Sequence, residues 1–93
     1  KRLPEFDEWL DSIKDSMTRL KLNRRLDKVQ RGNWGDVKHL QEGVWEMRAF
    51  FGAGFRMYYI QHGQVVIVML GGGDKSTQQR DIDRAIALSK TLE

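Results

Sequence analysis

The sequence predicts an α+β fold, in which an N-terminal helical hairpin packs on a small twisted, mainly antiparallel sheet and a C-terminal helix follows. Apolar residues recur at helical spacing before residue 32, alternate at strand spacing from residue 37 to residue 70, and return to helical spacing after residue 75. The 93 residues suit a single core. We therefore expect one domain that spans residues 1–93.

The first helix is predicted from one apolar stripe. Phe6, Trp9, Leu10 and Ile13 occupy positions i, i+3, i+4 and i+7, which lie on one side of a helix. Pro4 suits the first turn, where its missing N–H costs nothing.

A second helix is expected from Ser16 to Gln30, and a short polar link makes the two helices a hairpin. Its apolar side holds Met17, Leu20, Leu22, Leu26 and Val29. Its outer face is cationic and carries Arg19, Lys21, Arg24, Arg25, Lys28 and Arg31. The glycine-rich residues 32–35 end the helix.

Aromatic and β-branched residues predict strands over residues 44–50 and 55–60, joined by a hairpin loop at Gly52–Gly54. A turn at His62-Gly63 leads to a third strand over residues 64–70, which is apolar on both faces and so belongs in the sheet interior. Residues 37–40 predict a further strand. We expect the sheet to end at Gly71–Gly73. Helical spacing then predicts a helix from Ser76 to Leu92, whose start Ser76 and Gln79 would cap as a capping box.

The composition excludes several kinds of chemistry. The chain has no cysteine, which excludes disulfide scaffolds, cysteine-ligated zinc and thiol catalysis. His39 and His62 lack metal-ligand spacing, so we expect no metal and no cofactor. Residues 71–76 lack the glycine placement of a phosphate-binding loop. The serines lack a nucleophile-elbow context, so we do not expect triad hydrolysis.

The net charge and the hydropathy limit the kinds of partner that we expect, nucleic acid and membrane in particular. The net charge of +3 permits nucleic acid as a partner without requiring it. No apolar run approaches the ~20 residues that span a bilayer, and no charged leader precedes an apolar segment. We therefore expect a cytoplasmic protein without membrane contact.

Cations at strand positions are the remaining candidates for chemistry. With a three-residue loop at Gly52–Gly54, Phe51 pairs with Phe55 and Arg48 pairs with Tyr58. Glu46, Arg48, Arg56 and Tyr58 then share one face, with the two guanidiniums within about 10 Å of each other. Lys75 precedes the last helix, where free N–H groups attract anions, and Gln78, Gln79 and Arg80 follow.

Each of these side chains also has an ordinary structural interpretation. An arginine on a strand most often lies on the solvated face of a sheet, and an exposed lysine such as Lys75 needs no function. Tyr58 and Tyr59 serve equally well in core packing. The cations of the second helix can form a solvated face.

Four strings of residues resemble the addiction-module killer proteins, a HigB-like branch of the RelE/ParE toxin superfamily. They are Gly35-Asp36-Val37-Lys38, Glu42-Gly43-Val44-Trp45-Glu46-Met47-Arg48, Gly52-Ala53-Gly54-Phe55-Arg56-Met57-Tyr58 and Gly72-Gly73-Asp74-Lys75-Ser76-Thr77-Gln78. The likeness covers nearly the whole chain, and Lys1-Arg2-Leu3 resembles the remnant of a short first strand of that family.

The resemblance implies a type II toxin that cleaves mRNA on the translating ribosome without metal. Attack by a ribose 2′-OH needs a base, an acid for the leaving 5′-oxygen and cations for the phosphorane. By this likeness Arg48 and Arg56 form a phosphate clamp, and Lys75 is a second clamp or the general acid. The likeness assigns base or orienting roles to Lys38, Glu46 and Tyr58. It assigns contacts with the RNA to Lys38, Gln78 and Arg80. The chain lacks the His or Tyr of several relatives at the C-terminal catalytic position, which leaves the acid and base assignment open.

The implied partners are the ribosome, mRNA and a cognate HigA-like helix-turn-helix antitoxin, with operator DNA reached only through the antitoxin. We expect the antitoxin to contact Arg19, Arg24, Arg25, Lys28 and Trp34, with Trp34 and Phe51 as exposed aromatic anchors. Two alternatives remain open. A ParE-like protein would poison DNA gyrase by binding alone, and an inactive member would serve only as the antitoxin's partner and co-repressor.

Overall fold

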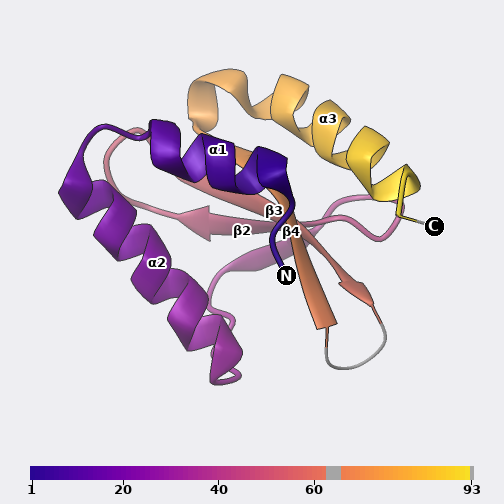
Figure 1. The fold of residues 1–93 in the computed structure, drawn as a ribbon, viewed down its shortest axis with the longest axis horizontal. Coiled ribbons are helices and arrows are strands. Elements are labelled where there is room, and N and C mark those ends of the chain that lie inside the picture. The colour runs from indigo at the N-terminus through magenta and orange to yellow at the C-terminus, as the bar shows by residue number, and fades with distance from the viewer. Residues whose placement is uncertain (63–65, 93) are drawn as a thin grey trace.

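A computed structural model describes residues 1–62 and 66–92 and confirms the predicted α+β class. Figure 1 shows α1 and α2 meeting at a sharp bend, with α1 and α3 lying along the sheet. In chain order the elements are α1 (Pro4–Ser12), α2 (Ser16–Gln30), β1 (Val37–His39), β2 (Trp45–Ala49), β3 (Phe55–His62), β4 (Val66–Gly73), the 3-10 turn η1 (Lys75–Thr77) and α3 (Gln78–Lys90).

The four strands form an antiparallel sheet in the order β1-β2-β3-β4. Arg2 makes one parallel bridge with Met69 on the outer edge of β4. There the Leu3 N–H donates to the Met69 carbonyl at 3.0 Å, and the Met69 N–H donates to the Lys1 carbonyl at 2.9 Å. Residues 1–3 therefore keep a single bridge at the place where the resemblance implies a short first strand.

Two apolar clusters lie on opposite faces of the sheet because successive strand residues point to opposite sides. The α1 and α2 face buries Phe6, Leu10, Leu22, Leu26, Val29, Met47, Ala49, Met57, Tyr59 and Met69. The α3 face buries Val44, Tyr58, Ile60, Val68, Leu70, Ala85 and Ile86. Each fully buried large side chain contributes about 1.5–3 kcal/mol, so both faces hold the fold together.

The structure corrects two details of the helices. Met17 and Leu20 are 57% and 42% exposed, so they do not join the core with the other apolar residues of α2. The predicted Ser76–Gln79 capping box is also wrong. The Asp74 carboxylate instead accepts from the Ser76 N–H at 2.8 Å, and η1 delays the start of α3 to Gln78.

The β2–β3 hairpin differs from the predicted register. Ala49 pairs with Phe55 and Arg48 with Arg56, so the connection is five residues long rather than three. The Gly54 N–H donates to the Phe51 carbonyl at 3.1 Å, and both Gly52 and Gly54 have positive φ. The loop is longer because it contains a hydrogen-bonded turn of its own. A shift of two residues preserves the face of every side chain.

The end of the sheet also differs from the prediction. Gly71–Gly73 belongs to β4 and pairs with β3 as far as Arg56, whereas the sequence placed these glycines after the last strand. A register shift between Tyr58 and Tyr59 lets the two strands stay paired through this stretch. His62 is the last residue of β3, and the predicted partner of its turn, Gly63, lies outside the described residues.

Within residues 1–62 and 66–92, no helix is long and apolar enough to cross a membrane.

The glycines of β4 give a matched test of the packing. A Cβ at Gly72 would lie 2.5 Å from the Trp9 ring, whereas a Cβ at Gly71 meets no atom within 4 Å. We expect Gly72→Ala to lower the free energy of unfolding by about 1–3 kcal/mol, because overpacking displaces α1 from the sheet. Gly71→Ala should change it by less than about 1 kcal/mol. Urea unfolding measures both, and equal stabilities would contradict the close approach of α1.

Candidate functional site

Five of the predicted site residues project from one face of the sheet. Lys38 pairs with Glu46, Glu46 with Tyr58, and Arg48 with Arg56. Directly opposed residues of an antiparallel pair share a face. The structure therefore places them together on the α3 face, although Arg48 lies opposite Arg56 and not opposite Tyr58 as expected.

Glu46 is the centre of this cluster. It is 1% exposed, and its carboxylate accepts hydrogen bonds from Arg56 Nη1 at 3.3 Å and from Gln78 Nε2 at 3.0 Å. Arg48 Nε lies 3.6 Å from Glu46 Oε1, the same oxygen that Arg56 contacts. A buried carboxylate is tolerated only with such partners. Glu46 thus fixes the positions of two guanidiniums and of the N-terminal end of α3.

The two arginines are held close together by one carboxylate. Both contact one carboxylate oxygen, so their contacting nitrogens lie within the roughly 10 Å expected from strand spacing. Arg48 Nε also lies 3.7 Å from Asp36 Oδ2. The Nε atoms of Arg48 and Arg56 are buried without a hydrogen-bond partner among the described residues. The side chains are nonetheless 31% and 12% exposed, and two guanidiniums held this close suit an oxyanion.

Tyr58 is fully buried beside Glu46. Its hydroxyl has no hydrogen-bond partner in the described part of the chain. Burial, together with the nearby carboxylates of Glu46 and Asp81, raises the pKa of Tyr58 well above its ordinary value. The phenol therefore stays protonated at neutral pH and can donate a hydrogen bond, but it cannot act as a base there.

Of the remaining predicted site residues, one contacts Glu46 and two are exposed at the surface near the start of α3. Gln78 joins the cluster through Glu46. Lys75 is exposed at the start of η1, and its Cβ lies 3.5 Å from the position that a Cβ on Gly54 would take, so it borders the β2–β3 loop. The side chain of Arg80 is mostly exposed and pairs with Asp81 at 3.9 Å rather than with Glu46. No group of three metal-ligating side chains occurs among residues 1–62 and 66–92.

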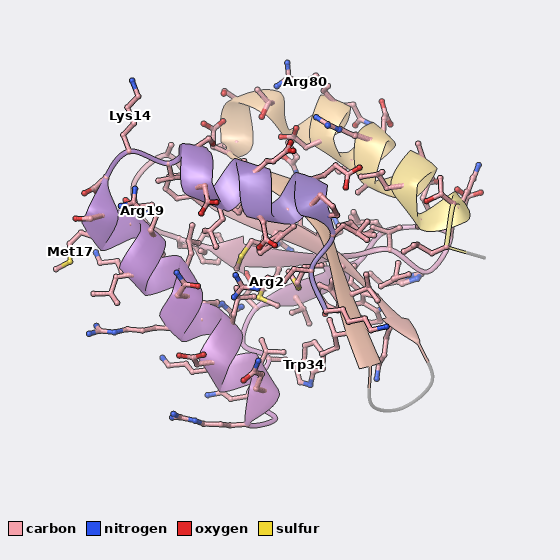
Figure 2. The ribbon with its side chains drawn as sticks, viewed as in Figure 1. Arg2, Lys14, Met17, Arg19, Trp34 and Arg80 are labelled. Carbon is pink, nitrogen blue, oxygen red and sulfur yellow. The ribbon has the colours of Figure 1, made fainter. Side chains whose placement is uncertain are left out.

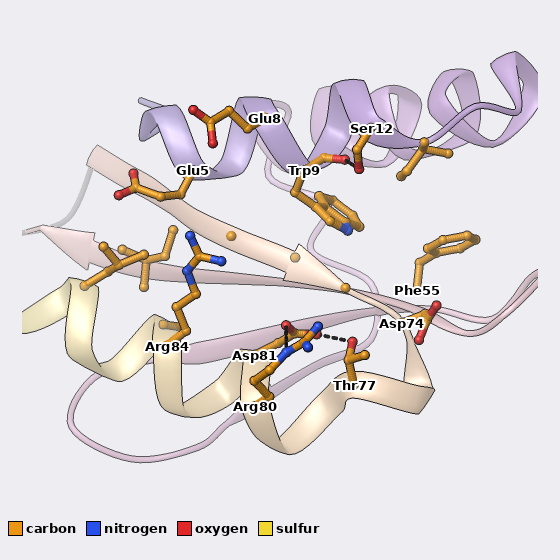
Figure 3. Close-up of a pocket in the computed structure, with 17 residues that line it drawn as sticks. Glu5, Glu8, Trp9, Ser12, Phe55, Asp74, Thr77, Arg80, Asp81 and Arg84 are labelled. Carbon is orange, nitrogen blue, oxygen red and sulfur yellow. Dashed lines mark hydrogen bonds and ion pairs between the residues drawn. The ribbon is translucent and has the colours of Figure 1, made fainter.

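The sequence analysis missed a groove of about 500 Å³ between α1 and α3. Figure 3 shows Glu5, Glu8 and Trp9 on the α1 side, with Arg80 and Arg84 on the α3 side. Gly71–Gly73 lies between them. The three consecutive glycines were the feature of the sequence that could have indicated this groove. A Cβ on Gly72 or Gly73 would collide with a side chain of α1 or α3, so the close approach of the two helices requires glycine there. The groove lies at the edge of β4, and Gly73 in its lining pairs with Arg56 of the cluster.

The residues predicted to bind an antitoxin do not form one free surface. Arg19 donates to the Ile13 carbonyl, and Arg25 donates to the Trp34 and Asp36 carbonyls at 2.5 and 3.1 Å. These guanidiniums therefore hold α2 to the chain that precedes it and to the loop that follows it. Arg24 and Lys28 are exposed, as the outer face of α2 requires.

The predicted aromatic anchors need correction as well. Trp34 is half-buried and stacks on Tyr59 with ring centroids 5.4 Å apart, because the loop after α2 folds back on the core. Phe51 packs against the same core, whereas its neighbour Phe50 is 75% exposed. The longer hairpin loop turns Phe51 inwards and leaves Phe50 outside. Figure 2 shows Trp34 beside the C-terminal end of α2, and Arg19 on α2 itself.

The buried ion pair gives a test of the cluster. Arg56→Ala should lower the free energy of unfolding by about 3–5 kcal/mol, because it removes a charged partner from the buried Glu46. The double variant Arg56→Ala/Glu46→Gln should regain part of that loss. Lys75→Ala, at an exposed position, should change stability by less than about 0.5 kcal/mol. Denaturant unfolding measures all three, and a fully stable Arg56→Ala protein would mean that Glu46 does not depend on this arginine.

Comparison with known proteins places the chain in a family. Residues 8–91 match the family described as phage derived protein Gp49-like (DUF891). An uncharacterized protein of Haemophilus influenzae is 40% identical over 87 residues, which cover 94% of this chain and 88% of that protein. No solved structure matches the chain significantly. The match spans both helical layers and the whole sheet, and the chain therefore belongs to the phage-derived Gp49-like family.

Proposed function

We propose that this protein is the toxin of a type II toxin–antitoxin system and acts as a HigB-like, ribosome-dependent mRNA endonuclease. The Gp49-like family to which it belongs is known for toxins of toxin–antitoxin modules in the RelE-like group. The observation that carries the proposal is the pair Arg48 and Arg56, directly opposed on the sheet and both in contact with the buried Glu46.

The proposed reaction is an internal transfer at phosphorus. The ribose 2′-OH gives its proton to water as its oxygen bonds to the phosphorus. The bond from phosphorus to the 5′-oxygen breaks and that oxygen takes up a proton, which leaves a 2′,3′-cyclic phosphate and a 5′-hydroxyl. Negative charge develops on the phosphoryl oxygens in between. Arg48 and Arg56 bring positive charge to these oxygens through side chains that remain 31% and 12% exposed, and Glu46 keeps them in place beforehand.

Lys75 supplies the third cation of the site. It is exposed beside the β2–β3 loop, so it can approach a phosphate held by the two arginines. There it neutralises the phosphorane or gives its proton to the 5′-oxygen. Tyr58 and Gln78 support the site from within as neutral groups, since the phenol is buried and stays protonated and the amide donates to Glu46. In the cell, a helix-turn-helix antitoxin would neutralise this activity.

Lys75 allows a test that leaves the fold intact. Induced expression of the protein should stop growth and produce defined breaks in mRNA, mapped by primer extension. Lys75→Ala should reduce cleavage by about 10²–10³-fold, which is typical for loss of one group that stabilises transition-state charge. Lys14→Ala, at another exposed lysine, should retain full activity.

Plasmid supercoiling is measured in the same cells. Toxicity without mRNA breaks, accompanied by a change in supercoiling, would replace the nuclease proposal with a gyrase poison. Absence of any growth defect would instead indicate an inactive partner of the antitoxin.

The ends of the RNA fragments test the chemistry. Attack by the 2′-OH leaves a 5′-hydroxyl on the downstream fragment, so polynucleotide kinase should label it without prior phosphatase treatment. Replacing the ribose upstream of the cleaved bond by 2′-deoxyribose should abolish the break, because it removes the nucleophile. Fragments that carry a 5′-phosphate would contradict this mechanism, since they indicate attack by water on phosphorus with the 3′-oxygen as the leaving group.

A further inference from the structure

A second cationic surface lies next to the arginine pair. Lys21, Arg24 and Lys28 are exposed on one side of α2, where residues three and four positions apart are neighbours. Phe50, at the start of the β2–β3 loop, is 75% exposed. These four residues, which we call the α2–loop surface, line one cavity of about 360 Å³.

This surface is continuous with the candidate site. Arg48 lines the same cavity and also contacts Glu46 in the arginine cluster. Arg25 joins α2 to the strand there, donating to the Arg48 carbonyl at 3.4 Å and to the Asp36 carbonyl at 3.1 Å. The Arg48 side chain lies on the α3 face and α2 packs on the other face, so a chain held at Arg48 reaches α2 by passing the end of β1 at Asp36, which lines the cavity and lies 3.7 Å from Arg48 Nε. The exposed Phe50 lines the same cavity.

The charges of the cavity favour a polyanion. Asp36 is the one acidic residue that lines it in the described part of the chain, and Asp36 already lies near Arg48 at 3.7 Å. Lys21 lies over the Phe51 ring at 5.1 Å, which keeps its ammonium group beside the loop. Exposed cations next to an exposed aromatic ring are the usual elements of a single-strand nucleic acid site, where cations contact phosphates and the ring stacks on a base.

We propose that the α2–loop surface binds the single-stranded RNA that continues beyond the phosphate held by Arg48 and Arg56. Arg24 and Lys28 contact successive phosphates, and Phe50 stacks on a base between them and the arginine pair. This inference rests on the proposed function and extends it. It assigns to the outer face of α2 a role in holding substrate rather than in chemistry.

Binding can be measured separately from cleavage. The probe is a fluorescein-labelled oligouridine of about ten nucleotides in which every 2′-OH is methylated, so that it has the phosphates but no nucleophile. Anisotropy titrations of the purified full chain over a range of salt concentrations give the affinity and its salt dependence. We expect the affinity to fall steeply as salt rises.

Charge-reversal variants test the phosphate contacts. Arg24→Glu/Lys28→Glu should weaken binding at low salt by about tenfold or more and reduce the slope of log affinity against log salt by about 1.4, since each contact with single-stranded RNA contributes about 0.7. The control Lys14→Glu/Arg84→Glu makes the same change of net charge at exposed residues outside the surface. It should alter the affinity by less than about threefold.

Variants of Phe50 distinguish stacking on a base from other apolar contacts with the RNA. Phe50→Leu should weaken binding by about fivefold or more without changing the salt slope, whereas Phe50→Trp should retain the affinity, because only an aromatic ring stacks on a base. Equal affinities for Phe50→Leu and the unchanged protein would overturn the stacking role.

The outcomes distinguish this inference from the proposed function. If the unchanged protein fails to bind the probe at low salt, or the Arg24/Lys28 double variant binds as well as the control, the inference is wrong while mRNA cleavage can still occur. If the double variant loses binding but expression produces no mRNA breaks, the surface stands and the nuclease proposal falls. Equal competition by polyglutamate, insensitive to Phe50→Leu, would identify a site for acidic protein segments and overturn the RNA assignment.

Discussion

The burial of one carboxylate, Glu46, is the constraint on which the arrangement of this molecule depends. A charge with 1% exposure must be matched by donors, and Glu46 recruits them from β2, β3 and the start of α3. Arg48 and Arg56 would otherwise repel each other across the strand pair, since like charges directly opposite destabilise a sheet. The carboxylate turns this repulsion into a fixed pair of guanidiniums.

This arrangement connects stability to the proposed chemistry. The same contacts that satisfy Glu46 hold both arginines in place while 31% of the Arg48 side chain and 12% of the Arg56 side chain stay exposed. Groups positioned before the reaction are the ones that stabilise developing charge most effectively. Glu46 is in this view a positioning residue, because its oxygens are already engaged.

The cations of α2 are divided between structure and surface. Arg19 and Arg25 donate hydrogen bonds to backbone carbonyls, and one of the carbonyls that Arg25 contacts is that of Arg48. Arg24 and Lys28 remain exposed. The structural arginines thus fix α2 against the sheet, and its free cations consequently lie next to the candidate site.

The sequence by itself determined the fold class, the bounds of α2 and the shared face of Glu46, Arg48 and Arg56, because helical and strand periodicities are local and a two-residue slip does not change a face. Only the tertiary structure decided which of these charges is buried, that Gln78 closes the cluster from a distant helix, and that Arg25 and Trp34 are occupied while Phe50 is free. Burial and partner choice depend on segments far apart in the chain, and periodicity carries no information about which of them meet.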